Sequence, residues 1–117
     1  MRFSKSLKLN HVFRKLYNRG HSSVTKYLVI YARPNRLGEN RIGVTVGKKL
    51  GKAVVRNRVR RRLREIYRIN EEQFLPGYDI VIVARTRAVD AEFQALQTAY
   101  LCAAQKLGLL RNKGDEA

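Results

Sequence analysis

The sequence predicts a two-layer α/β sandwich in which helices pack against a mixed sheet of about four strands. Short runs rich in β-branched and aromatic residues, typical of strands, alternate with longer segments of helical periodicity. The resulting order, α-β-β-β-α-β-α, favours helices stacked on a sheet. The chain has 117 residues, 44% of them hydrophobic, which is enough for one core. We therefore expect residues 1–117 to form a single domain.

The first helix is expected at residues 11–18. Asn10 is a suitable N-cap, and Gly20 follows the segment as a helix-ending residue. The residues before this helix are expected to be frayed. Its apolar side chains recur on one side, and two of them are aromatic: Val12, Phe13, Leu16 and Tyr17.

Two strands are expected at residues 27–33 and 41–47, where β-branched and aromatic side chains are dense. The turn-forming residues 34–40 lie between them, which predicts that the two strands pair with each other in antiparallel fashion. A further short strand is expected at residues 21–25.

The longest predicted helix spans residues 53–70 and carries most of the arginines. Seven arginines fall within residues 56–68, and Glu65 is the only acidic residue among them. The apolar residues of the segment repeat every three or four positions and predict one buried stripe: Val55, Val59, Leu63, Ile66 and Ile69. At 100° per residue, Asn57, Arg60, Arg61, Arg64 and Arg68 project away from this stripe, and Arg56, Arg58 and Arg62 flank it.

The nearly continuous apolar run at residues 78–85 predicts a central strand that is covered on both faces. A last helix is expected at residues 91–107, with Asp90 as its N-cap and Gly108 after its end. The tail at residues 109–117 is expected to be frayed.

The charge of the chain indicates a polyanionic partner. Lys and Arg total 25 against nine Asp and Glu, which gives a formal charge of +16, and no acidic residue precedes Glu39. Like charges one helical turn apart repel one another, and RNA phosphates would turn that repulsion into attraction. The single cysteine, Cys102, excludes an internal disulfide and a four-thiolate zinc site, and we expect it to lie in the core. No apolar run is long enough to span a bilayer.

No catalytic constellation is visible in the sequence. Adjacent Glu71 and Glu72 would point about 100° apart on a helix. Asp79, Asp90 and Glu92 lie at the ends of predicted elements, where capping accounts for them. We therefore predict neither catalytic residues nor a metal site in this chain.

Two groups of residues are suited to binding RNA. Residues 47–52, GKKLGK, lead from a strand into the arginine-rich helix, so that free backbone N–H groups and three lysines converge on a phosphate site. Phe13, Tyr17 and Tyr31 could line one cleft in which unpaired bases stack, beside Arg14.

The segment that begins at Lys48-Lys49 and continues through Gly51, Ala53-Val54 and Arg56-Asn57-Arg58 to Arg61 and Arg64-Glu65 resembles the bacterial ribonuclease P protein component. The resemblance extends, in the same order, to LKLNHVFRKLYNRG, YLVIYA, RIGVTV and YDIVIVAR. It therefore covers nearly the whole chain.

The resemblance implies an α/β sandwich with a left-handed βαβ crossover, acting as the protein subunit of an endoribonuclease whose RNA subunit carries catalysis. The catalytic RNA and the 5′ leader of precursor tRNA would be the partners, Mg²⁺ would be held mainly by RNA, and the complex would be cytoplasmic without an obligate protein partner. The expected RNA-binding residues are Lys48, Lys49, Lys52, Arg56, Asn57, Arg58, Arg60, Arg61, Arg64 and Arg68. The expected leader cleft comprises Phe13, Arg14, Tyr17 and Tyr31.

A ribosomal protein or an RNA chaperone is the alternative from a different class. Both classes require only phosphate neutralisation on a small α/β scaffold. Stimulation of a catalytic RNA at low Mg²⁺ would distinguish the prediction from this alternative.

Overall fold

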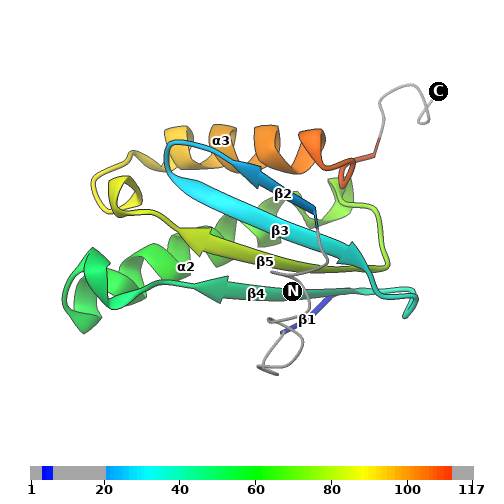
Figure 1. Cartoon of the computed structure of the whole chain (residues 1–117), viewed down its shortest axis with the longest axis horizontal. Helices are drawn as coiled ribbons and strands as arrows, with labels where there is room; N and C mark the ends of the chain where they lie inside the picture. Colours follow the sequence, from blue (N-terminus) through cyan, green and yellow to red (C-terminus); the bar gives the residue numbers. More distant parts are fainter. Residues whose placement is uncertain (1–3, 7–20, 112–117) are drawn as a thin grey trace.

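The structure, a computed structural model, describes residues 4–6 and 21–111. These residues form one sheet with the strand order β1-β4-β5-β3-β2, covered on one side by two helices (Figure 1). The strands are β1 (Ser4–Ser6), β2 (His21–Val24), β3 (Leu28–Pro34), β4 (Asn40–Thr45) and β5 (Tyr78–Ala84). The helices are α2 (Ala53–Asn70) and α3 (Phe93–Lys106), and three short 3-10 turns are η1 (Lys48–Leu50), η2 (Glu71–Gln73) and η3 (Thr86–Ala88). The predicted helix at residues 11–18 lies outside the described residues.

The predicted mixed sheet is confirmed, but the predicted pairing of its second and third strands is wrong. β5 lies between β3 and β4, antiparallel to β3 and parallel to β4. β5 takes this place because its apolar run is buried over most of its length, whereas β2 and the three-residue β1 fill the edges. The segment β4-α2-β5 is therefore a crossover between adjacent parallel strands. Its left-handedness stays a prediction.

Helix α2 has the bounds that the sequence predicts, but its buried face is slightly rotated. Val59, Leu63 and Ile66 are buried as expected, whereas Ile69 is 52% exposed. Tyr67 and Asn70 are buried in its place, because they follow Leu63 and Ile66 at the spacing of four that continues the stripe. The arginines consequently remain outside the core.

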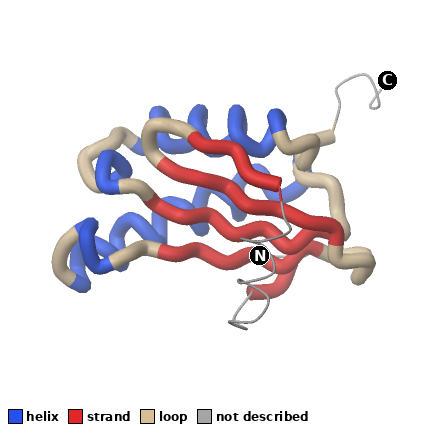
Figure 2. Tube along the Cα trace, viewed as in Figure 1, coloured by secondary structure: helices blue, strands red, loops and turns tan. Residues whose placement is uncertain are grey.

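Helix α3 begins at Phe93, two residues later than predicted, and Asp90 is not its N-cap. Glu92 occupies the cap position without a side-chain hydrogen bond. α3 packs against β3 and α2 against β4, so both helices lie behind the sheet in the view of Figure 2. Of the described helices, none has the length and hydropathy needed to cross a membrane.

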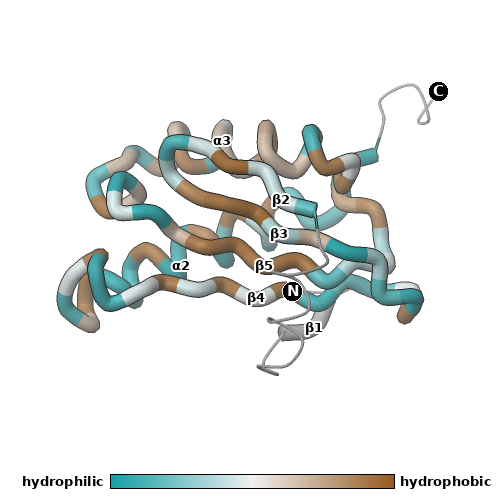
Figure 3. Tube along the Cα trace, in the orientation of Figure 1, coloured by the Kyte–Doolittle hydropathy of each residue, from teal (hydrophilic) through white to brown (hydrophobic). Residues whose placement is uncertain are grey.

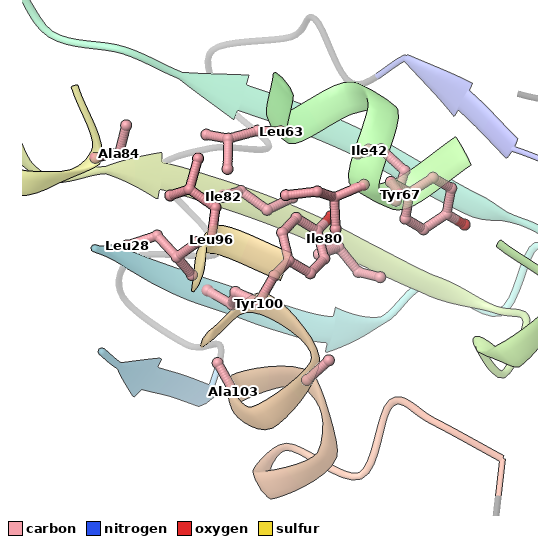
Figure 4. Close-up of a cluster of buried hydrophobic side chains, with 14 of the residues drawn as sticks. Leu28, Ile42, Leu63, Tyr67, Ile80, Ile82, Ala84, Leu96, Tyr100 and Ala103 are labelled. Carbon is pink, nitrogen blue, oxygen red and sulfur yellow. The ribbon is translucent and has the colours of Figure 1, made fainter. Parts of the chain in front are cut away.

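The core fills the space between the sheet and the two helices. Figure 3 shows the hydrophobic residues following β3 and β5 through the centre of the sheet. Strand residues Leu28, Ile80 and Ile82 meet helix residues Leu63, Leu96 and Tyr100, as Figure 4 shows, and all six are fully buried. Burial of each large aliphatic side chain contributes about 2 kcal/mol to folding.

Residues 4–6 and 109–111, the described parts of the two chain ends, are paired or buried, although fraying was predicted there. Ser4–Ser6 pairs with β4 as a parallel strand. Leu109 is fully buried, and the Arg111 amide donates a hydrogen bond to the Gln73 carbonyl at 2.7 Å. The expected fraying is therefore wrong for residues 4–6 and 109–111, where backbone pairing fixes the chain. Cys102 is exposed on α3 and does not lie in the core.

Replacing Tyr100 by phenylalanine is expected to stabilise the protein slightly, by up to about 1 kcal/mol. The Tyr100 hydroxyl is buried and has no hydrogen-bond partner among the described residues. Burial, together with the nearby Tyr67, raises the pKa of Tyr100 well above that of a free tyrosine. Because the folded pKa exceeds the unfolded value of about 10, the wild type should lose stability as pH rises above about 10.

Urea unfolding at pH 7, 10 and 11 measures this effect. The Tyr100→Phe variant should lose less stability than the wild type between pH 10 and 11. Parallel alkaline losses in the two proteins would contradict the assignment to Tyr100.

Candidate RNA interface

The entry into α2 forms an exposed cationic turn. Strand β4 is followed by Gly47 and by η1, in which Lys48 and Lys49 are exposed, and Lys52 occupies the N-cap position of α2. Gly51 has φ 134°, a backbone conformation that favours glycine, and a Cβ there would lie 3.4 Å from Val55. The turn thus brings the three lysines to the positive end of the helix dipole.

Helix α2 carries its arginines on two sides of the buried stripe. Arg60 and Arg64 lie on the side that also holds Asn57, and the Arg60 Nη1 donates a hydrogen bond to the Asn57 Oδ1 at 2.6 Å. Arg58 and Arg61 lie on the other side, nearer α3. The helix therefore offers cations over more than half of its circumference.

Glu65, the only acidic residue among these arginines, forms a salt bridge with Arg68. The Arg68 Nε donates a hydrogen bond to Glu65 Oε2 at 2.9 Å, and a second bond joins Arg68 Nη2 to Glu65 Oε1. Hydrogen bonding to Arg68 lowers the pKa of Glu65, and the same bonds raise the pKa of Arg68. Arg68 is thus partly neutralised, whereas the arginines nearer the start of α2 have no ion pair with a described carboxylate.

Arg56 is half-buried, at the start of α2. Its Nε is buried and has no hydrogen-bond partner within residues 4–6 and 21–111. A buried donor without a partner is costly, so a phosphate oxygen that reached this atom after a shift of the Arg56 side chain would gain a hydrogen bond and a charge pair.

The structure brings the predicted RNA-binding residues together on one continuous surface of η1 and α2. The exposed members are Lys48, Lys49, Lys52, Asn57, Arg58, Arg61, Arg64 and Arg68, and the half-buried members are Arg56 and Arg60.

Of the second predicted group, only Tyr31 belongs to the described residues, and it lies on the opposite face of the sheet. Leu28, Ile30 and Ala32 of β3 belong to the core, so the alternating Tyr31 points to the face away from the helices. Tyr31 is half-buried and lies in register with Val81 of β5. Phe13, Arg14 and Tyr17, the other expected members of the cleft, lie outside the described residues.

Asp79 is the carboxylate that the sequence interpretation misplaced. It is buried in β5, not used as a cap, and accepts hydrogen bonds from the Arg41 Nε at 2.7 Å and Nη2 at 2.6 Å. This bonding raises the pKa of Arg41. The alternation of buried and exposed residues could not reveal the ion pair of Asp79 with Arg41, because this ion pair forms only when β4 and β5 are neighbours.

Comparison with known proteins decides the family. Residues 1–108 match the family model described as Ribonuclease P. The chain belongs to the ribonuclease P protein family. It is 42% identical over 106 residues to the ribonuclease P protein component of Natranaerobius thermophilus, with 91% of this chain and 92% of the relative covered. It is 50% identical over 92 residues to that of Clostridioides difficile, with 78% and 81% covered.

Solved ribonuclease P proteins have the same fold. The protein from Staphylococcus aureus is 30% identical and superposes with a TM-score of 0.83, covering 91% of this chain and 97% of the other. The protein from Thermotoga maritima is 28% identical, with a TM-score of 0.79 and coverage of 92% and 99%. The chain is therefore a subunit of ribonuclease P, the endoribonuclease that forms tRNA 5′ ends, and works with the RNA of that enzyme.

Proposed function

We propose that η1 and α2 hold the catalytic RNA subunit of ribonuclease P. The observation that supports this proposal is the continuous cationic surface of η1 and α2. Glu65 is the only carboxylate within it, and it is paired with Arg68. Neutralising RNA phosphates would relieve the repulsion among these arginines and release counterions. The helix would act as a rigid support, because its apolar stripe fixes it to the sheet.

The opposite face of the sheet would receive the single-stranded 5′ leader of precursor tRNA. Tyr31 would offer a ring for base stacking, and Phe13, Arg14 and Tyr17 are its proposed neighbours. Rings and cations bind bases and phosphates with little sequence preference, as a subunit that meets many precursors requires. Because the two surfaces lie on opposite sides of the sheet, one protein could bind both RNAs at once.

Mg²⁺ would be held by the RNA. Within the described part of the chain, no three His, Cys, Asp or Glu side chains are grouped closely enough to bind a metal ion. The part we propose for the protein is to bind and orient RNA. We place this complex in the cytoplasm, with its RNA substrates.

Cleavage of precursor tRNA at low Mg²⁺ tests the proposal. The protein should accelerate cleavage by the cognate RNA subunit and should be inactive alone. Absence of stimulation would favour the alternative of a ribosomal protein or an RNA chaperone. Activity of the protein in RNA-free preparations would instead indicate a stand-alone nuclease.

Tyr31→Ala is expected to weaken binding of precursor tRNA by the assembled enzyme, by about fivefold to 100-fold. The range follows from the loss of one stacking contact, worth about 1–3 kcal/mol. Affinity for mature tRNA should not change, because it has no leader. Tyr31→Phe keeps the ring and should restore precursor binding. Equal losses for precursor and mature tRNA would contradict a role in leader binding.

A further inference from the structure

A cleft lies between the arginine-rich helix and the start of α3. It has a volume of about 360 Å³, and its lining combines cations with one aromatic ring: Arg58, Arg61, Arg62, Glu65 and Phe93. Arg62 and Phe93 are not among the residues predicted to bind RNA. Sequence periodicity could not pair them, because they come together only through the packing of α2 against α3.

One arginine of this cleft, Arg62, is held in place by a hydrogen bond, and none of its three arginines forms an ion pair with a described carboxylate. The Arg62 Nη1 donates a hydrogen bond to the Ala91 carbonyl at 2.9 Å, which fixes its guanidinium next to the start of α3. Glu65 is occupied by Arg68, and no described carboxylate forms an ion pair with Arg58, Arg61 or Arg62. Three arginines therefore line a cleft whose one carboxylate, that of Glu65, is already paired with Arg68.

Phe93 provides the apolar part of the cleft. It is half-buried and packs partly against the core, so its position is fixed while part of the side chain stays accessible. A nucleobase can stack on an aromatic ring or on a guanidinium plane, and the adjoining phosphates are attracted by arginine. Within a duplex both faces of a base are covered by the neighbouring base pairs, so the fitting ligand is an unpaired, unstacked nucleotide.

We propose that this cleft binds one unpaired RNA nucleotide, with its base against Phe93 and its phosphates held by Arg58, Arg61 and Arg62. This inference rests on the proposed binding of RNA by α2 and adds to it a stacking subsite. The cleft lies on the helix side of the sheet, away from Tyr31. The catalytic RNA is therefore the expected source of the nucleotide.

Phe93→Leu tests the proposal, because leucine keeps an apolar side chain but removes the ring. Its affinity for the isolated catalytic RNA should fall by about fivefold to 100-fold, the range for one base stacked on a ring. The salt dependence of binding should stay as in the wild type, since stacking releases no counterions. Phe93→Tyr keeps an aromatic ring and should bind the catalytic RNA with nearly the wild-type affinity. Arg61→Ala should instead reduce the salt slope by about one phosphate contact.

The control variant is Leu37→Ala, which shortens another accessible apolar side chain, 56% exposed, in the turn between β3 and β4. It should bind RNA as the wild type does, and thermal unfolding confirms that each variant is folded. An unchanged affinity of folded Phe93→Leu for both the catalytic RNA and precursor tRNA would overturn the stacking subsite.

Two further outcomes separate the source of the nucleotide from the proposed function itself. A loss seen only with precursor tRNA, and not with mature tRNA or the isolated catalytic RNA, would support the subsite and assign its nucleotide to the leader. Failure of the wild-type protein to bind the catalytic RNA would overturn the subsite together with the proposed function. Wild-type binding with no effect of Phe93→Leu would overturn the subsite alone.

Discussion

Joint replacement of Lys49, Arg60 and Arg64 by alanine is expected to weaken binding of the catalytic RNA about 100-fold at 0.15 M salt. Each phosphate contact contributes roughly 0.7–0.9 to the slope of log affinity against log salt, so three lost contacts lower that slope by about 2–3. Extrapolated to 0.15 M, this change corresponds to about two orders of magnitude in affinity. The three side chains lie on the accessible surface of η1 and α2, so the fold should survive.

A second triple variant separates local contacts from net charge. Replacing Lys26, Arg36 and Lys106 by alanine removes the same three charges from the +16 of the chain. These residues are exposed, and none of them lies on η1 or α2. If α2 binds the RNA directly, this control should lose much less affinity and should keep nearly the wild-type salt slope. Equal losses in the two triple variants would show that net charge alone drives binding.

Helices α2 and α3 were predictable because their periodicity is local. The apolar repeat of residues 55–69 covers about four helical turns, and both ends of α2 lie where the sequence predicts. Ile69 was wrongly predicted to be buried. The buried face of the helix is narrow, and Tyr67 and Asn70 lie nearer its centre than Ile69 does. Burial depends on the position of the neighbouring elements, which a single helical repeat does not contain.

Strand neighbours could not be predicted in the same way. An alternation of two residues assigns side chains to faces, but it does not say which strands pair. The turn at residues 34–40 favoured a hairpin of β3 with β4, yet the more completely buried β5 separates them. The position of Asp79 follows from this insertion, because it brings Arg41 of β4 next to β5.

In the candidate site, too, local features could be predicted from the sequence, whereas contacts between distant segments could not. Clustered charges identified the surface of α2 from the sequence, since every arginine of that cluster lies on one helix. The cleft at Phe93 was missed because its residues belong to α2 and α3 and meet only after folding. The one available signal was the flanking position of Arg62, which pointed to neither α3 nor any aromatic residue.

Asp79→Ala is expected to destabilise the protein by about 3 kcal/mol. Asp79 is 3% exposed and accepts two hydrogen bonds from Arg41 and a third, at 3.0 Å, from the Asn35 Nδ2. Removing one partner of a buried ion pair costs about 3–5 kcal/mol, and partial exposure of Arg41, 26% for its side chain, favours the lower end. For a domain of this size the loss corresponds to a fall in Tm of more than about 10 °C.

A double-mutant cycle with Arg41→Ala measures the coupling directly. Arg41→Ala leaves the buried Asp79 with the Asn35 amide but without its cation, so this variant should also be strongly destabilised. Asp79→Ala and Arg41→Ala together remove both charges, and their joint cost should be smaller than the sum of the single costs by more than about 1 kcal/mol. Because β5 is central and β4 leads into η1, the strands that Asp79 and Arg41 join also support the entry to α2. If the two single costs measured by urea unfolding add up to the joint cost, the predicted coupling is absent. The pair of Asp79 and Arg41 would then contribute no net stability between β4 and β5.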